Sequence, residues 1–109
     1  MAIQLPAPIA RYFAADRKGD IDAVAACFTE DAAVTDEGET THGQDAVRAW
    51  KQKSSSKYRY TAEPFAMVSA GDRTVVTARV SGDFPGSPVD LRYSFVLAAD
   101  RIATLEIGA

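Results

Sequence analysis

The spacing of apolar residues changes near the middle of the chain, from a helical pattern to an alternating one. Before residue 57 they recur at three- and four-residue intervals, and after it they tend to occupy every second position. A helical period predicts amphipathic helices, and a period of two predicts strands with one buried face. Helices followed by strands predict an α+β domain.

The first helix is predicted over roughly 6–18, because proline suits a first helical turn and Gly19 suits the end. Asp20 is a suitable N-cap for a short second helix. The apolar face of this second helix is predicted to consist of Ile21, Val24, Ala25 and Phe28.

A short strand is predicted over 32–35, followed by a polar loop over 36–43. A third helix is predicted after this loop, and it should end at the serine tract 54–56. Its apolar positions are Ala46, Val47 and Trp50.

From residue 57 onward the chain predicts strands, beginning with the alternation of Tyr58 and Tyr60. This long strand should bend at 63–64, because proline cannot donate to a sheet ladder. Turns are predicted at 71–72, 84–88 and 99–100, and the last strand covers 102–107.

Alternation assigns the two faces of this sheet. The inner face is predicted to carry Val76, Ala78, Val80, Leu91, Tyr93, Phe95 and Leu97, and the outer face Arg79, Asp90, Arg92 and Val96. A strongly curved sheet around the helices leaves a cone with an open wide end. That end is either a ligand pocket or is closed by Trp50 and Phe65.

Composition narrows the class of protein. The 109 residues predict one domain, and 47% of them are hydrophobic. A net charge of −3 without a Lys/Arg-rich stripe argues against nucleic-acid or anionic-membrane partners. No membrane span or secretory signal is apparent. The lone Cys27 excludes an internal disulfide and fits a cytoplasmic protein, as a buried inert thiol rather than a nucleophile.

Two polar residues are candidates for chemistry: Tyr12 on the first helix and Asp36 at the end of the first strand. If both face one apolar cavity, a hydrogen-bond donor meets a base, as proton transfer next to a carbonyl requires. Alternatively, Tyr12 is a boundary residue of an amphipathic helix, and Asp36 belongs to a solvated acidic loop with Glu37 and Glu39.

The segment ARYFAADRKGDIDAVAACFTEDAAVTDE (10–37) resembles the nuclear transport factor 2-like superfamily, in particular its SnoaL-like and ketosteroid isomerase-like branch. The resemblance extends over nearly the whole chain, as one SnoaL-like domain over 1–109. It implies a cone-shaped, cystatin-like α+β fold, with three N-terminal helices on a strongly curved, mainly antiparallel sheet. It also implies an apolar small-molecule ligand and a homodimer formed through the outer sheet face.

The same resemblance implies roles for particular residues. Tyr12 matches the tyrosine that donates to an enolate oxygen, and Asp36 matches the base that carries the proton. Tyr93 stands where the isomerases have a protonated aspartic acid, and Asp90 points to the opposite face. A neutral phenol at Tyr93 can still donate. The expected pocket walls are Phe13, Trp50, Phe65, Val80 and Phe95, and for Phe13 and Trp50 the alternative is plain core.

Three functions remain open: an isomerase or polyketide cyclase-like enzyme, a non-catalytic binding domain for a hydrophobic metabolite, and a dimeric interaction module with a filled cone. We predict no metal and no cofactor. His42 is the single histidine, and its spacing from Asp36 and Glu39 matches no metal motif. It is expected to close the acidic loop onto the third helix. Asp16 either orients Tyr12, one helical turn away, or is a surface charge.

Overall fold

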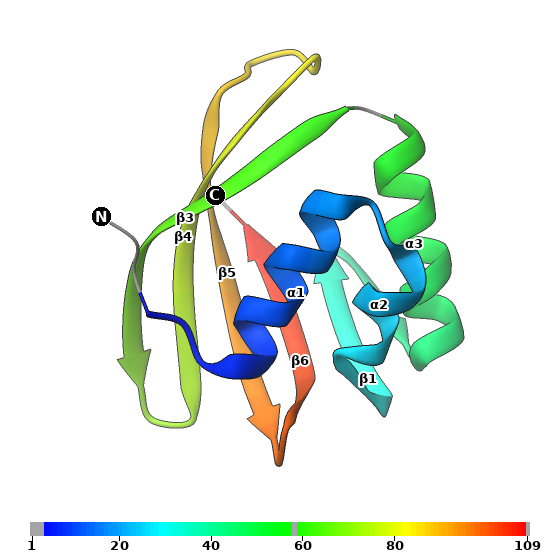
Figure 1. The fold of residues 1–109 in the computed structure, drawn as a ribbon, viewed down its shortest axis with the longest axis vertical. Coiled ribbons are helices and arrows are strands. Elements are labelled where there is room, and N and C mark those ends of the chain that lie inside the picture. The colour runs from blue at the N-terminus through cyan, green and yellow to red at the C-terminus, as the bar shows by residue number, and fades with distance from the viewer. Residues whose placement is uncertain (1–3, 58, 109) are drawn as a thin grey trace.

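The computed structural model describes residues 4–57 and 59–108, in which three helices pack on one six-stranded sheet (Figure 1). The helices are α1 (Ala7–Lys18), α2 (Ile21–Ala26) and α3 (Gln44–Lys57). The strands are β1 (Phe28–Asp36), β2 (Glu39–His42), β3 (Tyr60–Ala70), β4 (Arg73–Gly82), β5 (Val89–Ala98) and β6 (Arg101–Gly108).

The sheet has the order β2-β1-β6-β5-β4-β3. β1 and β6 run parallel, and the other neighbouring pairs are antiparallel. Helix α1 crosses in front of the sheet, and α3 lies beside β1 (Figure 1). The α+β class and the mainly antiparallel sheet are therefore confirmed.

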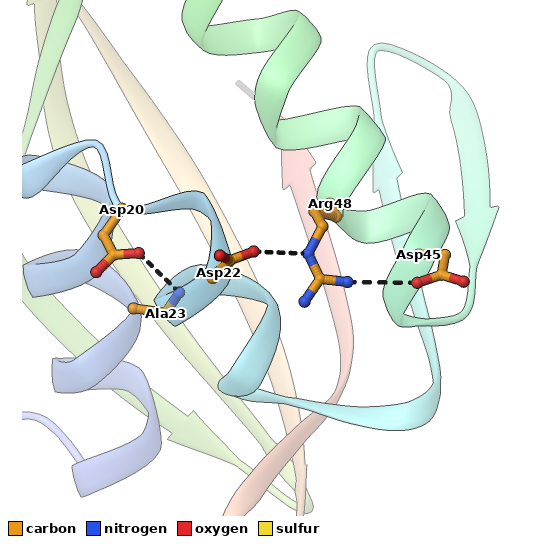
Figure 2. Close-up of polar contacts among 5 residues, drawn as sticks. All are labelled: Asp20, Asp22, Ala23, Asp45 and Arg48. Atoms are coloured by element: carbon orange, nitrogen blue, oxygen red, sulfur yellow. Dashed lines mark hydrogen bonds and ion pairs between the residues drawn. The ribbon is translucent and has the colours of Figure 1, made fainter.

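A tight turn joins α1 to α2, as the sequence predicts. Gly19 adopts a left-handed conformation with φ 71°, and its N–H donates to the carbonyl of Asp16. Asp20 then caps α2, and its carboxylate accepts from the backbone N–H of Ala23 at 3.1 Å (Figure 2).

Arg48 ties α3 to α2 on the surface of the protein. Its Nε donates to Asp22 of α2 at 2.9 Å, and its Nη1 donates to Asp45 of α3 at 3.3 Å (Figure 2). We call this exposed group the Arg48 clamp. It holds the two helices side by side at the edge of the helical layer.

Two predictions for the segment after α2 are wrong. Phe28 does not belong to α2, because it begins β1, where its side chain is fully buried. Residues 36–43 are not a loop, since β2 pairs with β1 from Ala33↔His42 to Asp36↔Glu39. The turn between them has positive φ at Glu37 (54°) and Gly38 (79°), which matches the twist of a two-residue hairpin. His42 therefore ends a strand rather than closing a loop.

The end of α3 also differs from the prediction. The serines at 54–56 form part of the helix, which continues to Lys57. β3 accordingly begins at Tyr60 instead of 57, and Tyr58 lies outside the described residues. Helix α3 as a whole packs against α2 and β1, and the modest helix propensity of serine is not enough to end it.

The predicted bend in β3 is confirmed by a register shift between Pro64 and Ala66. Phe65 is the extra residue of this bulge, and 49% of its surface is exposed. Its ring lies 5.9 Å from the Arg79 guanidinium on the outer face. The prediction that Phe65 lines or closes the pocket is therefore wrong, because the bulge turns its side chain outward.

The core lies between α1 and the inner sheet face. Val76, Ala78, Val80, Tyr93 and Phe95 are buried, with Leu91 and Leu97 packed against them, which confirms the inner face. The predicted outer face is likewise confirmed, since Arg79, Asp90 and Arg92 are exposed and Val96 is half-buried.

Cys27 is buried behind α2, where its thiol donates to the Ala23 carbonyl, and burial raises its pKa. A raised pKa keeps the group as a thiol, which favours the inert reading. None of the helices in the described ranges is long and apolar enough to span a bilayer.

Candidate functional site

A cavity of about 720 Å³ opens between α1, α3 and the sheet, where β1 and β6 end and β5 begins. Its walls combine apolar side chains of the sheet with aromatic and charged side chains of the helices. The lining residues are Tyr12, Asp36, Glu37, Glu39, Thr41, Trp50, Lys51, Lys53, Ser54, Tyr60, Val80, Phe84, Pro85, Val89, Leu91, Tyr93, Ile107 and Gly108.

The three residues predicted to carry chemistry all line this cavity. Tyr12 reaches it from α1, Asp36 from the end of β1, and Tyr93 from the middle of β5. Trp50 of α3 donates from its indole Nε1 to Asp36 Oδ2 at 3.0 Å. This bond fixes the orientation of the carboxylate and leaves Oδ1 available to a ligand.

A buried cation lies beside Tyr12. Lys51 Nζ approaches Asp16 Oδ1 at 2.9 Å, and it donates to Tyr60 Oη at 3.0 Å and to Tyr12 Oη at 3.2 Å. Tyr60 in turn donates to Asp16 Oδ1 at 3.1 Å. We call these four residues the Lys51 cluster.

Aromatic rings surround the ammonium group as well. Lys51 Nζ lies 4.4 Å from the ring centroid of Trp50, 5.3 Å from that of Tyr12 and 5.7 Å from that of Tyr60. Such distances allow cation–π attraction, which strengthens when water is excluded. The ammonium group is thus held by one carboxylate and by several rings.

Burial and neighbouring carboxylates keep the cavity phenols protonated. Desolvation, followed by the negative charge of Asp16, raises the pKa of Tyr12 well above its ordinary value. Desolvation also raises the pKa of Tyr60 and of Tyr93, and Asp16 adds to both shifts. All three phenols are therefore neutral and able to donate a hydrogen bond at physiological pH.

The predicted pocket walls divide into three groups. Trp50 and Val80 line the cavity. Phe13 and Phe95 lie in the core next to it, where their ring centroids are 5.1 Å and 6.4 Å from that of Tyr93. Phe65 lies outside, as described above. For Phe13 the alternative of plain core is therefore correct, and the prediction that Phe95 lines the pocket is wrong, because its side chain is fully buried in the core.

Two further polar residues with predicted roles are Asp16 and His42, and neither belongs to a metal site. Asp16 pairs with Lys51 and makes no hydrogen bond to Tyr12, and it affects the phenol through its negative charge, which raises the pKa of Tyr12. His42 is exposed at the end of β2. Within the described ranges, no three His, Cys, Asp or Glu side chains are grouped closely enough to hold a metal ion.

Sequence reasoning missed Lys51 and Tyr60 as cavity residues. A signal for Lys51 was present, since Val47, Lys51 and Ser54 follow the helical spacing of four and then three residues. Val47 is fully buried, so the residues on the same side of α3 also turn inward. Lys51 was nevertheless missed, because a lysine followed by a polar segment is typical of the solvated end of a helix.

A family model of the SnoaL-like domain matches residues 9–103. Among solved structures, a candidate polyketide cyclase from Sinorhizobium meliloti is 44% identical, with a TM-score of 0.91 and 95% of each chain covered. No curated protein matches this chain in sequence.

More distant structures share the fold. A protein with a ketosteroid isomerase-like fold from Catenulispora acidiphila, in complex with trimethylamine, has a TM-score of 0.85 at 18% identity, over 97% of this chain and 87% of that one. A second candidate polyketide cyclase, from Xanthomonas campestris, has a TM-score of 0.80 at 20% identity, over 92% of this chain and 85% of that one.

Proposed function

This chain belongs to the SnoaL-like family of nuclear transport factor 2-like domains, and on that premise we propose that it moves a proton next to the carbonyl group of an apolar compound. The observation that carries the proposal is that Asp36 and Tyr12 line the same cavity. The similarity to a candidate polyketide cyclase supports the same reaction class.

In this proposal Asp36 is the base. Its carboxylate oxygen takes the proton from the carbon next to the carbonyl, and the C–H electron pair moves into the carbon–carbon bond as the enolate forms. Trp50 holds the other carboxylate oxygen, so the base does not have to be oriented during the reaction. Val80, Leu91 and Ile107 supply the apolar wall for the substrate.

Tyr12 is the proposed donor to the enolate oxygen, with Tyr93 as a second donor. Both phenols are neutral, so each can donate to the negative charge that develops on the oxygen. Where a carbon–carbon double bond adjoins the deprotonated carbon, the enolate extends over it and the proton on Asp36 returns to the far end of the double bond, which is an isomerisation. Alternatively, the enolate carbon attacks a second carbonyl group of the same substrate and closes a ring, and the alkoxide oxygen so formed takes the proton from Asp36.

Proton exchange tests this proposal without knowledge of the natural substrate. Cyclic ketones are incubated in deuterated buffer, and loss of the α-proton signal is followed by NMR. Asp36→Asn should abolish catalysed exchange, and Tyr12→Phe should lower its rate by about 100-fold, the cost of one lost oxyanion donor.

Asp31→Asn is the matched control, because it removes an exposed carboxylate from the same strand, outside the lining of the cavity. It should exchange at the wild-type rate. Equal exchange in wild type, Asp36→Asn and Tyr12→Phe would contradict the proposal.

A binding domain without catalysis is the second candidate, and Tyr93 favours it, because this position lacks the acidic residue that the resemblance implies. Such a domain would bind apolar ketones with the same affinity in wild type and Asp36→Asn, without exchange in either. The open cavity of about 720 Å³ argues against the third candidate, an interaction module with a filled cone.

We further propose that two copies associate through the outer sheet face. Phe65 and Val68 of β3 expose 49% and 63% of their surfaces. Val68 pairs with Val75, so the two valines can form an apolar strip on this face. Sedimentation should detect a dimer that Val68→Lys dissociates, and a wild-type monomer at every concentration would contradict this.

A further inference from the structure

The Lys51 cluster contains a buried ion pair to which the proton transfer described above assigns no role. Lys51 and Asp16 are the partners, and their side chains are only 4% and 7% exposed. Burial of two charges is costly, and an apolar pair of similar size is often as stable. An ion pair kept at the wall of a ligand cavity therefore suggests a role toward the ligand.

The contacts of Lys51 determine how Tyr12 can bond. Lys51 donates to the hydroxyl oxygens of Tyr60 and Tyr12, and Asp16 provides its counter-charge. The Tyr12 oxygen is an acceptor in this contact, so its own proton is available in another direction. Because Tyr12 lines the cavity, that direction includes the space where a ligand oxygen would lie.

The ammonium charge also strengthens this donor. A hydrogen bond accepted from a cation draws electron density from the phenol oxygen, so the phenol proton becomes a better donor. The chain of contacts then runs from Lys51 to the Tyr12 hydroxyl and on to a ligand oxygen. Its effect is greatest when that ligand oxygen is negatively charged.

Asp36 changes charge during the proposed reaction, and this affects the cavity. Before proton transfer its carboxylate disfavours a second negative charge in the same cavity. After transfer it is neutral, and the negative charge resides on the ligand oxygen, which faces Tyr12. The negative charge thus lies first on the Asp36 carboxylate and then on the ligand oxygen, while the Lys51 ammonium stays beside Tyr12 in both states.

We propose that Lys51 is a positioning residue that acts through Tyr12, and that it makes the cavity selective for ligands with an ionised oxygen, such as enolates and phenolates. The inference rests on the proposed function, because it takes the ligand oxygen to face Tyr12. It adds a preference for a charged oxygen over a neutral carbonyl or ether.

Phenol binding tests this preference directly. The experiment uses the full chain with Asp36→Asn, because a neutral amide stands in for the protonated base. Affinities are measured for a series from phenol to 4-nitrophenol, whose substituents make the hydroxyl progressively more acidic, and absorbance reports how much of the bound ligand is ionised. Affinity should rise along the series, and 4-nitroanisole, which cannot ionise, should bind more weakly.

In this background Lys51→Met should lower the affinity for 4-nitrophenolate by about ten-fold, as expected for loss of a charge-assisted contact, and reduce the ionised fraction. Its effect on 4-nitroanisole should be less than about two-fold, because that ligand carries no charge. Arg48→Met is the matched control, since it removes a cation from the same helix on the solvent side. It should change neither affinity.

A double-mutant cycle shows whether Lys51 acts through the phenol. When Tyr12→Phe is already present, Lys51→Met should no longer alter the preference for 4-nitrophenolate over 4-nitroanisole. A purely structural role would lower both affinities together. That outcome, or a full effect of Lys51→Met without the Tyr12 hydroxyl, would overturn the proposal.

Loss of folding in Lys51→Met does not prevent the test. Lys51→Gln, which is neutral and still donates a hydrogen bond, should give the same loss of preference, and circular dichroism verifies that each variant is folded. The series in the Asp36→Asn protein needs no change at Lys51, and an affinity independent of phenol acidity would also overturn the proposal.

The outcome for ligand preference is separate from the outcome for catalysis. If wild type exchanges ketone protons but Lys51→Met keeps its preference for phenolates, only the present inference fails. If wild type catalyses no exchange but Lys51→Met loses the preference, the proposed function fails and anion recognition by the cavity stands.

Discussion

Arg48 and Lys51 of helix α3 are both ion-paired cations less than one turn apart, and they lie in opposite environments. Arg48 faces solvent, with 40% of its side chain exposed, and its partners Asp22 and Asp45 are more exposed still. Lys51 faces the cavity with 4% exposed, and its partner Asp16 is 7% exposed. Both pairs have a contact of 2.9 Å, so distance alone does not distinguish them.

The difference between them is the cost of desolvation. In the Arg48 clamp, water already satisfies each charge, so forming the pair changes the free energy little. In the Lys51 cluster each charge has lost its water and depends on its partner. Although the contact distances are equal, substitution of Arg48 should therefore change the stability of the fold little, and substitution of Lys51 should change it greatly.

The largest expected effect follows from removing the buried cation. Lys51→Met should lower the free energy of unfolding by about 3–5 kcal/mol, because Asp16 is left buried without its counterion. Arg48→Met should lower it by less than about 1 kcal/mol. Urea denaturation of both variants measures the two values, and equal losses would show that the environment of the cation does not matter.

The sequence predicted much of the fold because local signals and tertiary packing agree there. The αL conformation of Gly19 and the cap at Asp20 produce the α1–α2 turn. Period-two alternation in β4 and β5 identifies the buried face correctly, since each side chain faces either the helices or solvent. β2 was missed because an edge strand such as Glu39–His42 can form through backbone pairing without an apolar face.

The site was predictable only in part, for a related reason. Tyr12 and Tyr93 lie on elements with clear periodicity, so their directions could be inferred. By contrast, the sequence pattern assigned Asp36 to a polar loop, and only its place at the strand end and the family resemblance indicated the cavity. Burial of Lys51 depends instead on a partner far away in the sequence, and charge does not indicate whether a lysine is solvated or paired. Phe65 faced outward because the bulge at Pro64 shifted the register by one residue.

A second prediction tests whether the buried pair stabilises the fold at all. Combining Lys51→Met with Asp16→Leu removes both charges and leaves apolar side chains in their place. The double variant should regain about 2 kcal/mol or more relative to Lys51→Met, because no unpaired charge remains. A double variant less stable than wild type by several kcal/mol would instead show that the pair itself provides net stability.

Alkaline pH should lower the free energy of unfolding through the buried phenol of Tyr12 in the cavity. The Arg48 clamp should contribute nothing to this pH dependence. Folding raises the pKa of Tyr12 above the ordinary value of 10.0, so above that pH the unfolded chain loses its proton first. Stability contributed by this group is complete below pH 10.0 and falls as the pH rises, by up to about 1.4 kcal/mol per pH unit.

Urea titrations from about pH 8 to about pH 11 measure this slope. Tyr12→Phe should flatten it, and Arg48→Met should leave it unchanged, because Arg48 is exposed and makes its contacts on the surface, away from the phenol. A slope that is identical in wild type and Tyr12→Phe would mean that the buried phenol ionises without unfolding the protein.

The smallest effects are expected within the Arg48 clamp. Because its charges are solvated, a double-mutant cycle of Arg48→Met with Asp22→Asn should give a coupling of about 0.2–1 kcal/mol at low salt. In about 1 M salt the Debye length shrinks to about 3 Å, so this coupling should largely disappear. The corresponding coupling between Lys51 and Asp16 should persist, because salt ions do not enter a buried pair. If the two couplings were screened equally, Lys51 would have to be as accessible to the solvent as Arg48, and the physical basis for its action on Tyr12 would be lost.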